Sequence, residues 1–322
     1  MRSLITGNLG FLGTNLTLFF LKKGFEVVGV DNFSYCSNIE ALRIMKIYRN
    51  FKFFKVDIKD KRLIPKLIEK CDVIVNLAAF THVDNSIRMP ELFVKNNIAS
   101  FQKFLNFFKE SDKRRDKILI HVSTDEVYGE ILKGEAKENN NFNPRNVYSA
   151  TKVAQECLIN AYKETYKLKA VVLRPCNVFG YWQHHEKLIP KTIILALKNK
   201  KVPVYGDGTQ VREWLFCEDF NRAIELIIEK RIEDGVYNVG SGARKKNIEV
   251  VKKILNILNK DFSLIDFVGD RPGHDRRYAV NSERIKSLGF ETKFDFEDAL
   301  KRTTAWYVEN TRNKKLKNKN YV

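Results

Sequence analysis

The sequence predicts an α/β fold, a Rossmann-type doubly wound parallel sheet with a smaller C-terminal substrate-binding lobe. Through the first half of the 322-residue chain, short apolar runs alternate with longer amphipathic runs. Continuously apolar runs are typical of parallel strands buried on both faces, and their alternation with helices is typical of a doubly wound sheet. A glycine-rich turn between the first apolar run and the first amphipathic run supports this prediction, because such turns open dinucleotide-binding folds.

The expected elements follow one another in regular order. We expect strands at residues 4–5, 26–30, 51–56, 73–76, 117–122 and 170–173. We expect helices at residues 11–23, 39–48, 63–70, 91–110 and 147–166. Right-handed crossovers between these strands would place helices on both faces of the sheet.

The alternation ends after Arg174, where prolines and paired glycines interrupt the pattern. We therefore expect a Rossmann domain over residues 1–173, which also carries the catalytic residues, and a lobe for the substrate mainly over residues 174–322. Residues near 217–240 are expected to return to the main sheet. The basic residues 311–322 are expected to form a frayed tail.

The composition narrows the class of protein. Hydrophobic residues make up 44% of the chain, enough for a large core. The formal net charge of +18 suits a nucleic-acid partner, but the lysines are spread along the chain and no nucleic-acid-binding motif is present, so we expect no such partner. No apolar run approaches the ~20 residues of a membrane span, and no secretory signal precedes the first strand. We expect a cytoplasmic protein without membrane contact.

Metal binding is not expected. The five cysteines are scattered and form no CxxC pair, so they predict neither a disulfide framework nor a zinc site. His184 and His185 are adjacent and lack acidic partners, and adjacent histidines rarely face one ion.

The cofactor site is predicted by Gly7, Gly10 and Gly13, which follow the first strand and open the first helix. Glycines there allow a tight turn and close approach of the backbone to a pyrophosphate, which the helix N-terminus stabilises. Asp31 ends the second strand, where a carboxylate can bind both ribose hydroxyls of an adenosine and repel a 2′-phosphate. The sequence therefore favours NAD over NADP.

Tyr148 and Lys152 form a Tyr-x-x-x-Lys pair on one face of the helix at residues 147–166. A lysine cation beside a phenol lowers the pKa of the phenol. The tyrosine can then act as a general base near neutral pH.

Thr124, Asp125 and Glu126 directly follow the strand at residues 117–122. In open α/β sheets, ligands bind beyond the carboxyl ends of the strands. Repulsion between neighbouring carboxylates can leave one of them protonated, which supplies an acid and a base side by side. A helix N-cap with a polar first turn would explain these three residues alone, but the glycine turn and the Tyr148–Lys152 pair favour a catalytic interpretation.

Residues 1–310 resemble the dTDP-glucose 4,6-dehydratases, which are extended short-chain dehydrogenases/reductases. The specific stretches are Ser-Thr-Asp-Glu-Val-Tyr-Gly at residues 123–129 and Arg-Pro-Gly-His-Asp-Arg-Arg at residues 271–277. The resemblance implies NAD-dependent conversion of dTDP-glucose to dTDP-4-keto-6-deoxyglucose. The steps would be oxidation at C4, elimination of water across C5 and C6, and return of the hydride to C6.

The resemblance also implies a role for each catalytic residue. Tyr148 would take the proton of the sugar 4-hydroxyl, Thr124 would hydrogen-bond to that oxygen, and Lys152 would hold the cofactor ribose. Glu126 would remove the C5 proton. Asp125 would protonate the departing 6-hydroxyl.

Two sets of binding residues and a homodimer are implied in the same way. The expected NAD contacts are Gly7, Gly10, Phe11, Leu12, Gly13, Asp31, Asn32, Asp57, Ile58, Leu77, Ala78, Ala79, Asn96, Tyr148 and Lys152. The expected substrate contacts are Thr81, His82, Asn177, Glu186, Lys187, Leu188, Arg212, Asn247, Arg271 and His274. The two arginines suit bidentate capture of phosphate oxygens. Helices near residues 91–110 and 147–166 would form the dimer contact.

The nucleotide base stays open. Asn8 and Leu9 stand where a second glycine and an alanine are usual, Asn85 replaces a usual arginine, and residues 35–38 and 177–180 look as much like UDP-glucose 4,6-dehydratases. One methyl group discriminates by only ~1–3 kcal/mol, so UDP-glucose is an alternative substrate. A nucleotide-sugar 4-epimerase or decarboxylase and a non-catalytic nucleic-acid or regulatory module are the rival functions. The adjacent carboxylates argue against an epimerase or decarboxylase. The intact set of five catalytic residues argues against a non-catalytic module.

Overall fold

The larger part of the molecule is a seven-stranded sheet with the strand order β10-β6-β5-β4-β1-β2-β3, parallel throughout. The computed structural model describes residues 1–112 and 116–319, with side chains through Thr311. The strands are β1 (Arg2–Thr6), β2 (Glu26–Asp31), β3 (Phe51–Lys55), β4 (Val73–Asn76), β5 (Ile118–Val122), β6 (Ala170–Pro175) and β10 (Asp234–Val239). The predicted α/β class and doubly wound parallel sheet are confirmed.

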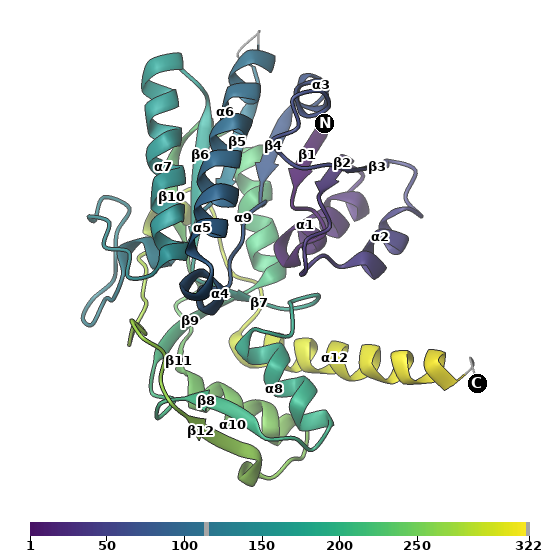
Figure 1. Cartoon of the computed structure of the whole chain (residues 1–322), viewed down its shortest axis with the longest axis vertical. Coiled ribbons are helices and arrows are strands. Elements are labelled where there is room, and N and C mark those ends of the chain that lie inside the picture. Colours follow the sequence, from purple (N-terminus) through teal and green to yellow (C-terminus); the bar gives the residue numbers. More distant parts are fainter. Residues whose placement is uncertain (113–115, 320–322) are drawn as a thin grey trace.

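Helices cover both faces of this sheet (Figure 1). One face carries α1 (Phe11–Lys22), α2 (Ile39–Met45) and α9 (Cys217–Glu229). The other face carries α3 (Ile64–Glu69), α6 (Ser100–Ser111) and α7 (Val147–Tyr166). Because side chains alternate along a strand, each buried strand must be apolar on both sides, which explains the continuous apolar runs.

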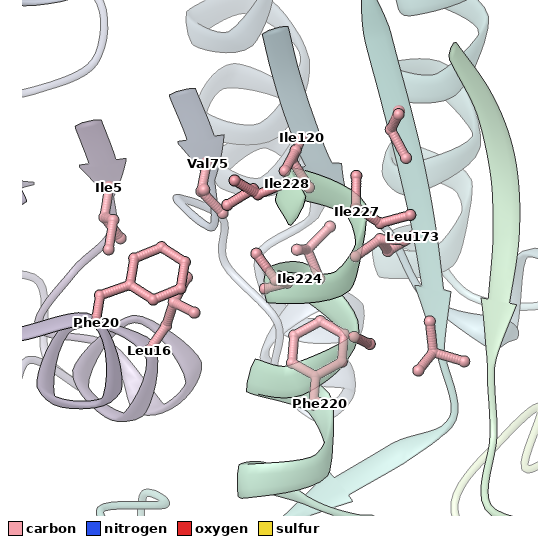
Figure 2. Close-up of a cluster of buried hydrophobic side chains, with 14 of the residues drawn as sticks. Ile5, Leu16, Phe20, Val75, Ile120, Leu173, Phe220, Ile224, Ile227 and Ile228 are labelled. Atoms are coloured by element: carbon pink, nitrogen blue, oxygen red, sulfur yellow. The ribbon is translucent and has the colours of Figure 1, made fainter. Parts of the chain in front are cut away.

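The first core layer lies between the sheet and helices α1 and α9. Figure 2 shows Ile5, Val75 and Ile120 of the sheet facing Phe20 of α1 and Phe220 of α9. The preceding residue of each strand points to the opposite face and joins the second layer; these residues are Leu4, Ile74 and Leu119. Each fully buried side chain of this kind contributes about 1.5–3 kcal/mol relative to an exposed one, so the two layers stabilise the sheet that carries the site.

The segment at residues 91–110 differs from the single helix that the sequence predicts. It comprises α5 (Pro90–Phe93), a π-helical turn η1 (Val94–Ala99) and α6. Within the π turn, Asn97 accepts a hydrogen bond from the Phe80 amide (2.8 Å) and donates to the Phe80 carbonyl (2.9 Å) and to Thr151 Oγ1 (3.0 Å). The π turn therefore connects the loop at Phe80 to α7. The sequence did not predict this turn, because one extra residue in a helical turn leaves no clear mark in the spacing of the apolar residues. A further short helix, α4 (Val83–Arg88), was not predicted.

A second lobe lies beyond the carboxyl edge of the sheet (Figure 1). It contains a three-stranded sheet of β7 (Asn177–Phe179), β9 (Val211–Phe216) and β11 (Arg244–Lys246), and a strand pair of β8 (Val202–Tyr205) and β12 (Ile265–Val268). Its helices are α8 (Leu188–Leu197), α10 (Asn247–Ile257) and α12 (Phe296–Lys319). Between β9 and β11 the chain passes back through α9 and β10 of the main body.

The short elements complete the chain. They are the 3₁₀ turns η2 (Asp125–Tyr128) and η3 (Phe262–Leu264) and the helix α11 (Glu283–Lys286). Residues 311–319 of the predicted basic tail form the end of α12, and residues 320–322 lie outside the described residues. No helix in the described part of the chain is both long and apolar enough to span a membrane.

Candidate active site

A continuous cleft runs along the carboxyl edge of the main sheet and into the second lobe. Its first section is lined by the β1–α1 turn and the ends of β2 and β4, and its middle section by Thr124, Asp125, Glu126 and Tyr148. The third section lies against β8, β9 and α8 of the second lobe. Glu126 lines both the middle and the third section, so the two carboxylates stand where a cofactor and a substrate would meet.

The β1–α1 turn approaches the β4 loop so closely that side chains would not fit. Gly7 has a φ of +65°, and a Cβ at Gly7 would lie 2.9 Å from the Ala78 backbone. A Cβ at Gly13 would lie 2.1 Å from the Gly7 carbonyl oxygen. Such contacts require glycine, and they leave the backbone open toward the cleft.

The N-terminus of α1 is free to bind an anion. Gly10 is its N-cap, no side chain caps the helix, and no acidic residue lies in its first turn. The unpaired N–H groups and the helix dipole favour a pyrophosphate at this point. The turn therefore fits a dinucleotide.

Asp31 lies at the end of β2 and is buried. One carboxylate oxygen accepts the Leu9 amide (3.1 Å), and the other accepts the Phe33 amide (2.8 Å) and the Ser37 hydroxyl (2.8 Å). A carboxylate offers about four acceptor positions, so these contacts leave room for a ribose hydroxyl. Its negative charge opposes a 2′-phosphate.

The other residues expected at the cofactor lie around the first two sections of the cleft, with one exception. Asn32, Asp57, Ile58, Leu77, Ala78, Ala79 and Asn96 line the first section, and Phe11, Leu12 and Gly13 line the middle section. The Asn32 amide donates to Asp57 (3.2 Å). Lys152 does not line the cleft but lies beneath it, only 3% exposed.

Thr124, Asp125 and Glu126 leave β5 and enter the turn η2. Thr124 is the N-cap of that turn, and its hydroxyl accepts the Glu126 amide (3.3 Å) and donates to Asp125 (3.3 Å). The N-cap of α7, Asn146, donates its side-chain amide to Glu126 (3.0 Å). This bond connects the turn to the helix that carries Tyr148.

The two adjacent carboxylates have different surroundings. Burial, Glu126 and Glu213 raise the pKa of Asp125 well above its usual value, against the opposite effects of Arg212 and Thr124. Among the described residues, Asp125 Oδ2 has no hydrogen-bond partner. Glu126 is partly exposed to the cleft and bonded to Asn146. Asp125 is thus suited to hold a proton as an acid, while Glu126 offers a carboxylate base.

Tyr148 departs from the expectation based on Lys152. Burial and the charges of Glu126 and Asp125 raise the pKa of the Tyr148 phenol, and the Thr124 hydroxyl lowers it. The expected lowering by Lys152 is wrong for this state of the protein, because the lysine bonds elsewhere. Lys152 Nζ donates to the Val122 carbonyl (2.7 Å), and burial lowers its pKa to about 7.

Most of the residues expected at the substrate line the third section of the cleft. These are His82, Asn177, Glu186, Lys187, Leu188, Arg212, Asn247, Arg271 and His274, while Thr81 lines the middle section. In the described part of the chain, Asn177 Oδ1, Asn247 Oδ1 and Arg271 Nε are buried without a hydrogen-bond partner. Buried polar atoms are seldom left unpaired, so these three fit a polar ligand in the cleft.

Several contacts join the two lobes across the cleft. Tyr205 donates its hydroxyl to Asp84 (3.0 Å), and Arg271 lies 3.4 Å from the other Asp84 oxygen. Lys187 donates to the Thr81 carbonyl (3.2 Å). Arg212 donates to the Asp275 carbonyl (2.8 Å) and lies over the Tyr278 ring. Arg212 is therefore held in place by residues of its own lobe.

Sequence reasoning missed four residues of this site. Asp84, Tyr205 and Tyr278 line the third section, and Asn146 supports Glu126. An N-cap signal existed at Asn146, since an asparagine precedes the Tyr148 helix and Ser149 completes a capping box. Asp84 and Tyr278 lie two and four residues from the predicted contacts His82 and His274, and Tyr205 lies 121 positions from its partner Asp84, so no capping or spacing pattern marked these three.

Comparisons with known proteins agree with this geometry. A sequence model of the family described as GDP-mannose 4,6 dehydratase matches residues 4–303. The chain belongs to the nucleotide-sugar 4,6-dehydratase family. The resemblance to the dTDP-glucose 4,6-dehydratases stated from the motifs is thereby confirmed.

The chain is similar to three known proteins over almost its whole length. The low-salt glycan biosynthesis protein Agl12 of Haloferax volcanii is 40% identical over 96% of this chain and 99% of its own. A trifunctional UDP-glucose 4,6-dehydratase/epimerase/reductase of Arabidopsis thaliana, RHM2, is 39% identical over 95% of this chain and 47% of its own. The solved structure of DesIV from Streptomyces venezuelae, a dTDP-glucose 4,6-dehydratase with NAD and TYD bound, has a TM-score of 0.93 and 34% identity. It covers 97% of this chain and 98% of that one.

Proposed function

We propose that this protein is an NAD-dependent nucleotide-sugar 4,6-dehydratase and that its substrate is dTDP-glucose. The observation that carries the proposal is the pair formed by Asp125 and Glu126, a buried carboxyl whose pKa is raised beside a carboxyl that opens to the cleft and accepts from Asn146, at the junction of the cofactor and substrate sections. Elimination of water needs both groups in one place. The product would be dTDP-4-keto-6-deoxyglucose, and the enzyme would be a hydro-lyase.

The first section of the cleft would hold NAD. Gly7, Gly10 and Gly13 would admit the pyrophosphate to the N-terminus of α1, and Asp31 would bind the adenosine ribose. When bound, NAD⁺ would supply a hydride acceptor for the oxidation at C4 and, in its reduced form, a hydride donor for C6. The close approach of Gly7 to Ala78 supports this assignment, since any side chain would close the turn.

The chain's own residues would then move the protons. Tyr148 would accept the proton of the 4-hydroxyl, and the Thr124 hydroxyl lowers the pKa of the phenol against burial and the two carboxylates, which raise it. The 4-ketone acidifies the C5 proton, which Glu126 would remove. Asp125 would donate its proton to the 6-hydroxyl, so that water leaves.

The second lobe would hold the nucleotide. Arg212 and Arg271 would face the diphosphate, because guanidinium groups match phosphate oxygens with two parallel hydrogen bonds. The unpaired atoms of Asn177 and Asn247 would serve the sugar and the base. UDP-glucose is the second candidate substrate, since the trifunctional RHM2, which includes a UDP-glucose 4,6-dehydratase, is 39% identical to this chain and the dTDP-glucose 4,6-dehydratase DesIV is 34% identical.

A homodimer is part of the proposal. Exposed apolar side chains follow one another here: Ile87 on α4, Met89 between α4 and α5, Leu92 on α5 and Val94 at the start of η1, beside the helices α6 and α7 expected at the contact. Exposed apolar side chains grouped in this way suit a protein contact. Sedimentation of the wild type and of Leu92→Glu would test it: the dimer should dissociate in the variant.

A cytoplasmic location is proposed too, and the five free cysteines suit a reducing compartment.

The experiment for the reaction is incubation of the purified protein with dTDP-glucose, and separately with UDP-glucose, followed by mass spectrometry. Loss of one water from the sugar without consumption of added reductant supports dehydration. The substrate with the higher kcat/KM identifies the base. An unchanged mass with both nucleotide sugars would contradict the proposal.

A further inference from the structure

Arg212 carries a buried positive charge that no carboxylate of the described residues neutralises by a direct contact. It belongs to β9, lines the third section of the cleft and is only 5% exposed. In the described part of the chain Arg212 forms no ion pair, whereas the similarly buried Arg174 is paired with Glu156 (2.6 Å). A buried charge is costly unless it is paired, so Arg212 fits an anion that the ligand supplies.

Three contacts within the protein fix the guanidinium of Arg212. Nη1 donates to the Val211 carbonyl (2.9 Å), and Nη2 donates to the Asp275 carbonyl (2.8 Å). The guanidinium carbon lies 4.2 Å from the centre of the Tyr278 ring. A guanidinium has five N–H donors, so three remain for phosphate oxygens. The contacts therefore orient the group and still leave it donors for a ligand.

Tyr278 is itself held in one orientation. It is 2% exposed, its hydroxyl donates to Asp275 Oδ2 (2.5 Å), and its amide donates to the Val211 carbonyl (3.2 Å). Asp275 is also buried and is paired with Arg145 (3.2 Å). Burial and the charge of Glu126 raise the pKa of Tyr278 well above its usual value, so the phenol stays a donor. The ring therefore offers the guanidinium a fixed surface.

We propose that Tyr278 is a positioning residue for Arg212, holding the guanidinium in the orientation in which it captures the diphosphate of the nucleotide. An aromatic face attracts a guanidinium, most strongly where water is excluded. Because the ring restrains Arg212 before the ligand arrives, less side-chain freedom is lost on binding. The inference rests on the proposed function for the nature of the ligand.

Arg271, the other arginine expected at the diphosphate, is held differently. Its Nε is buried without a hydrogen-bond partner among the described residues, and its Nη1 lies 3.4 Å from the Asp84 carboxylate. A phosphate would compete with Asp84 for Arg271, whereas it would meet available donors on Arg212. Tyr278 also lines the third section, so a direct contact between its side chain and the ligand is the alternative that the test separates.

The test is a double-mutant cycle on the affinity of the full-length protein for dTDP, or for UDP if that binds more tightly, measured by calorimetry. Tyr278→Leu should lower the affinity about tenfold when Arg212 is present, and by less than about twofold in the Arg212→Gln background. With the nucleotide sugar, Tyr278→Leu should raise KM and leave kcat within about threefold of wild type. Tyr237→Leu is the matched control, because Tyr237 is also buried, lies against the Arg284 guanidinium (4.7 Å) and does not line the cleft.

A second variant covers the case in which Tyr278→Leu does not fold. Tyr278→Phe keeps the ring but loses the bond to Asp275, and should lower the affinity about threefold with Arg212 present and not at all in the Arg212→Gln background. Equal losses in the two backgrounds, unchanged affinity in the folded variants with Arg212 present, or a wild type that binds neither dTDP nor UDP would overturn the inference. A wild type that binds the nucleotide but does not dehydrate the sugar would count against the proposed reaction alone.

Discussion

The two ends of the cleft are built in different ways. The cofactor end is made of backbone: the turn at Gly7–Gly13 and the strand-end residues Leu77, Ala78 and Ala79 lie so close together that no further side chain fits. The substrate end is made of charged side chains brought from both lobes, and several of them are paired with each other, such as Arg271 with Asp84. One end depends on shape and the other on charge.

The difference explains how each end should respond to change. A backbone cradle tolerates no added atom, and Asp31 and Asp57 are the charged side chains that line it. A set of side-chain pairs tolerates added volume better, but it loses affinity when one charge is removed. Asp125 and Glu126 lie between the two ends and are expected to affect neither binding event strongly.

The largest effect is expected at this junction. Asp125→Asn and Glu126→Gln should each slow dehydration by about 10²–10⁴-fold, because each removes one proton-transfer group. NAD affinity, measured by calorimetry, should stay within about threefold of wild type, since neither residue belongs to the backbone cradle. Asp298→Asn on the exposed start of α12 is the carboxylate control and should change neither quantity. Equal loss of both quantities would show that the pair has a folding role.

At the substrate end, Arg271→Gln should raise KM for the nucleotide sugar about 10–100-fold, because a charge-assisted hydrogen bond is worth about 1.5–3 kcal/mol. NAD affinity should not change. Asp84→Asn frees Arg271 from a partly exposed pair and should lower KM by no more than about fivefold. Steady-state kinetics of the two variants should therefore move KM in opposite directions, and a rise in both would contradict this account of the substrate end.

At the cofactor end, Gly13→Ala should lower NAD affinity about 5- to 150-fold, since the added Cβ would meet the Gly7 carbonyl at 2.1 Å and shift the turn. Gly269→Ala, where a Cβ would meet nothing within 4 Å, is the matched control. Calorimetric titration with NAD checks both variants. Unchanged affinity in a folded Gly13→Ala protein would show that the turn is not the pyrophosphate site.

The smallest effect is on stability. The folded-state pKa of Asp125 is raised, so between the usual aspartate pKa and that raised value the folded protein binds more protons than the unfolded chain. Stability contributed at this residue therefore falls as pH rises through the window. Asp125→Asn cannot ionise, and its melting temperature should exceed that of wild type by about 2 °C or more at pH 8, with a smaller difference at pH 5. Thermal unfolding at the two pH values measures this, and a gap that widens toward acid would contradict the assignment.

The sequence predicted the features that depend on local patterns and missed those that depend on contacts between distant residues. The apolar strands, the glycine turn and the Thr124–Glu126 run are local patterns, and the structure contains the sheet and brings these residues to one cleft. The π turn at Val94–Ala99 left no trace in the apolar periodicity. The Asp84–Tyr205 bond joins residues 121 positions apart, so no window of sequence could contain it.

The effect of Lys152 on the pKa of Tyr148 could not be predicted from the sequence either. The spacing of Tyr148 and Lys152 places both on one face of α7, yet the lysine bonds to Val122 and approaches His121. Whether a cation lowers the pKa of a phenol depends on where the amine points and on the burial of both groups. These are properties of packing, which spacing along a helix does not determine.

The proposed reaction is a closed cycle in which the hydrogen taken from C4 returns to C6 of the same sugar while Asp125 and Glu126 eliminate water. It is tested most directly with dTDP-glucose carrying deuterium at C4, analysed by mass spectrometry and NMR of the product. The product should have lost one water and should carry the deuterium in its C6 methyl group. Deuterium retained at C4, or lost to solvent without dehydration, would contradict it.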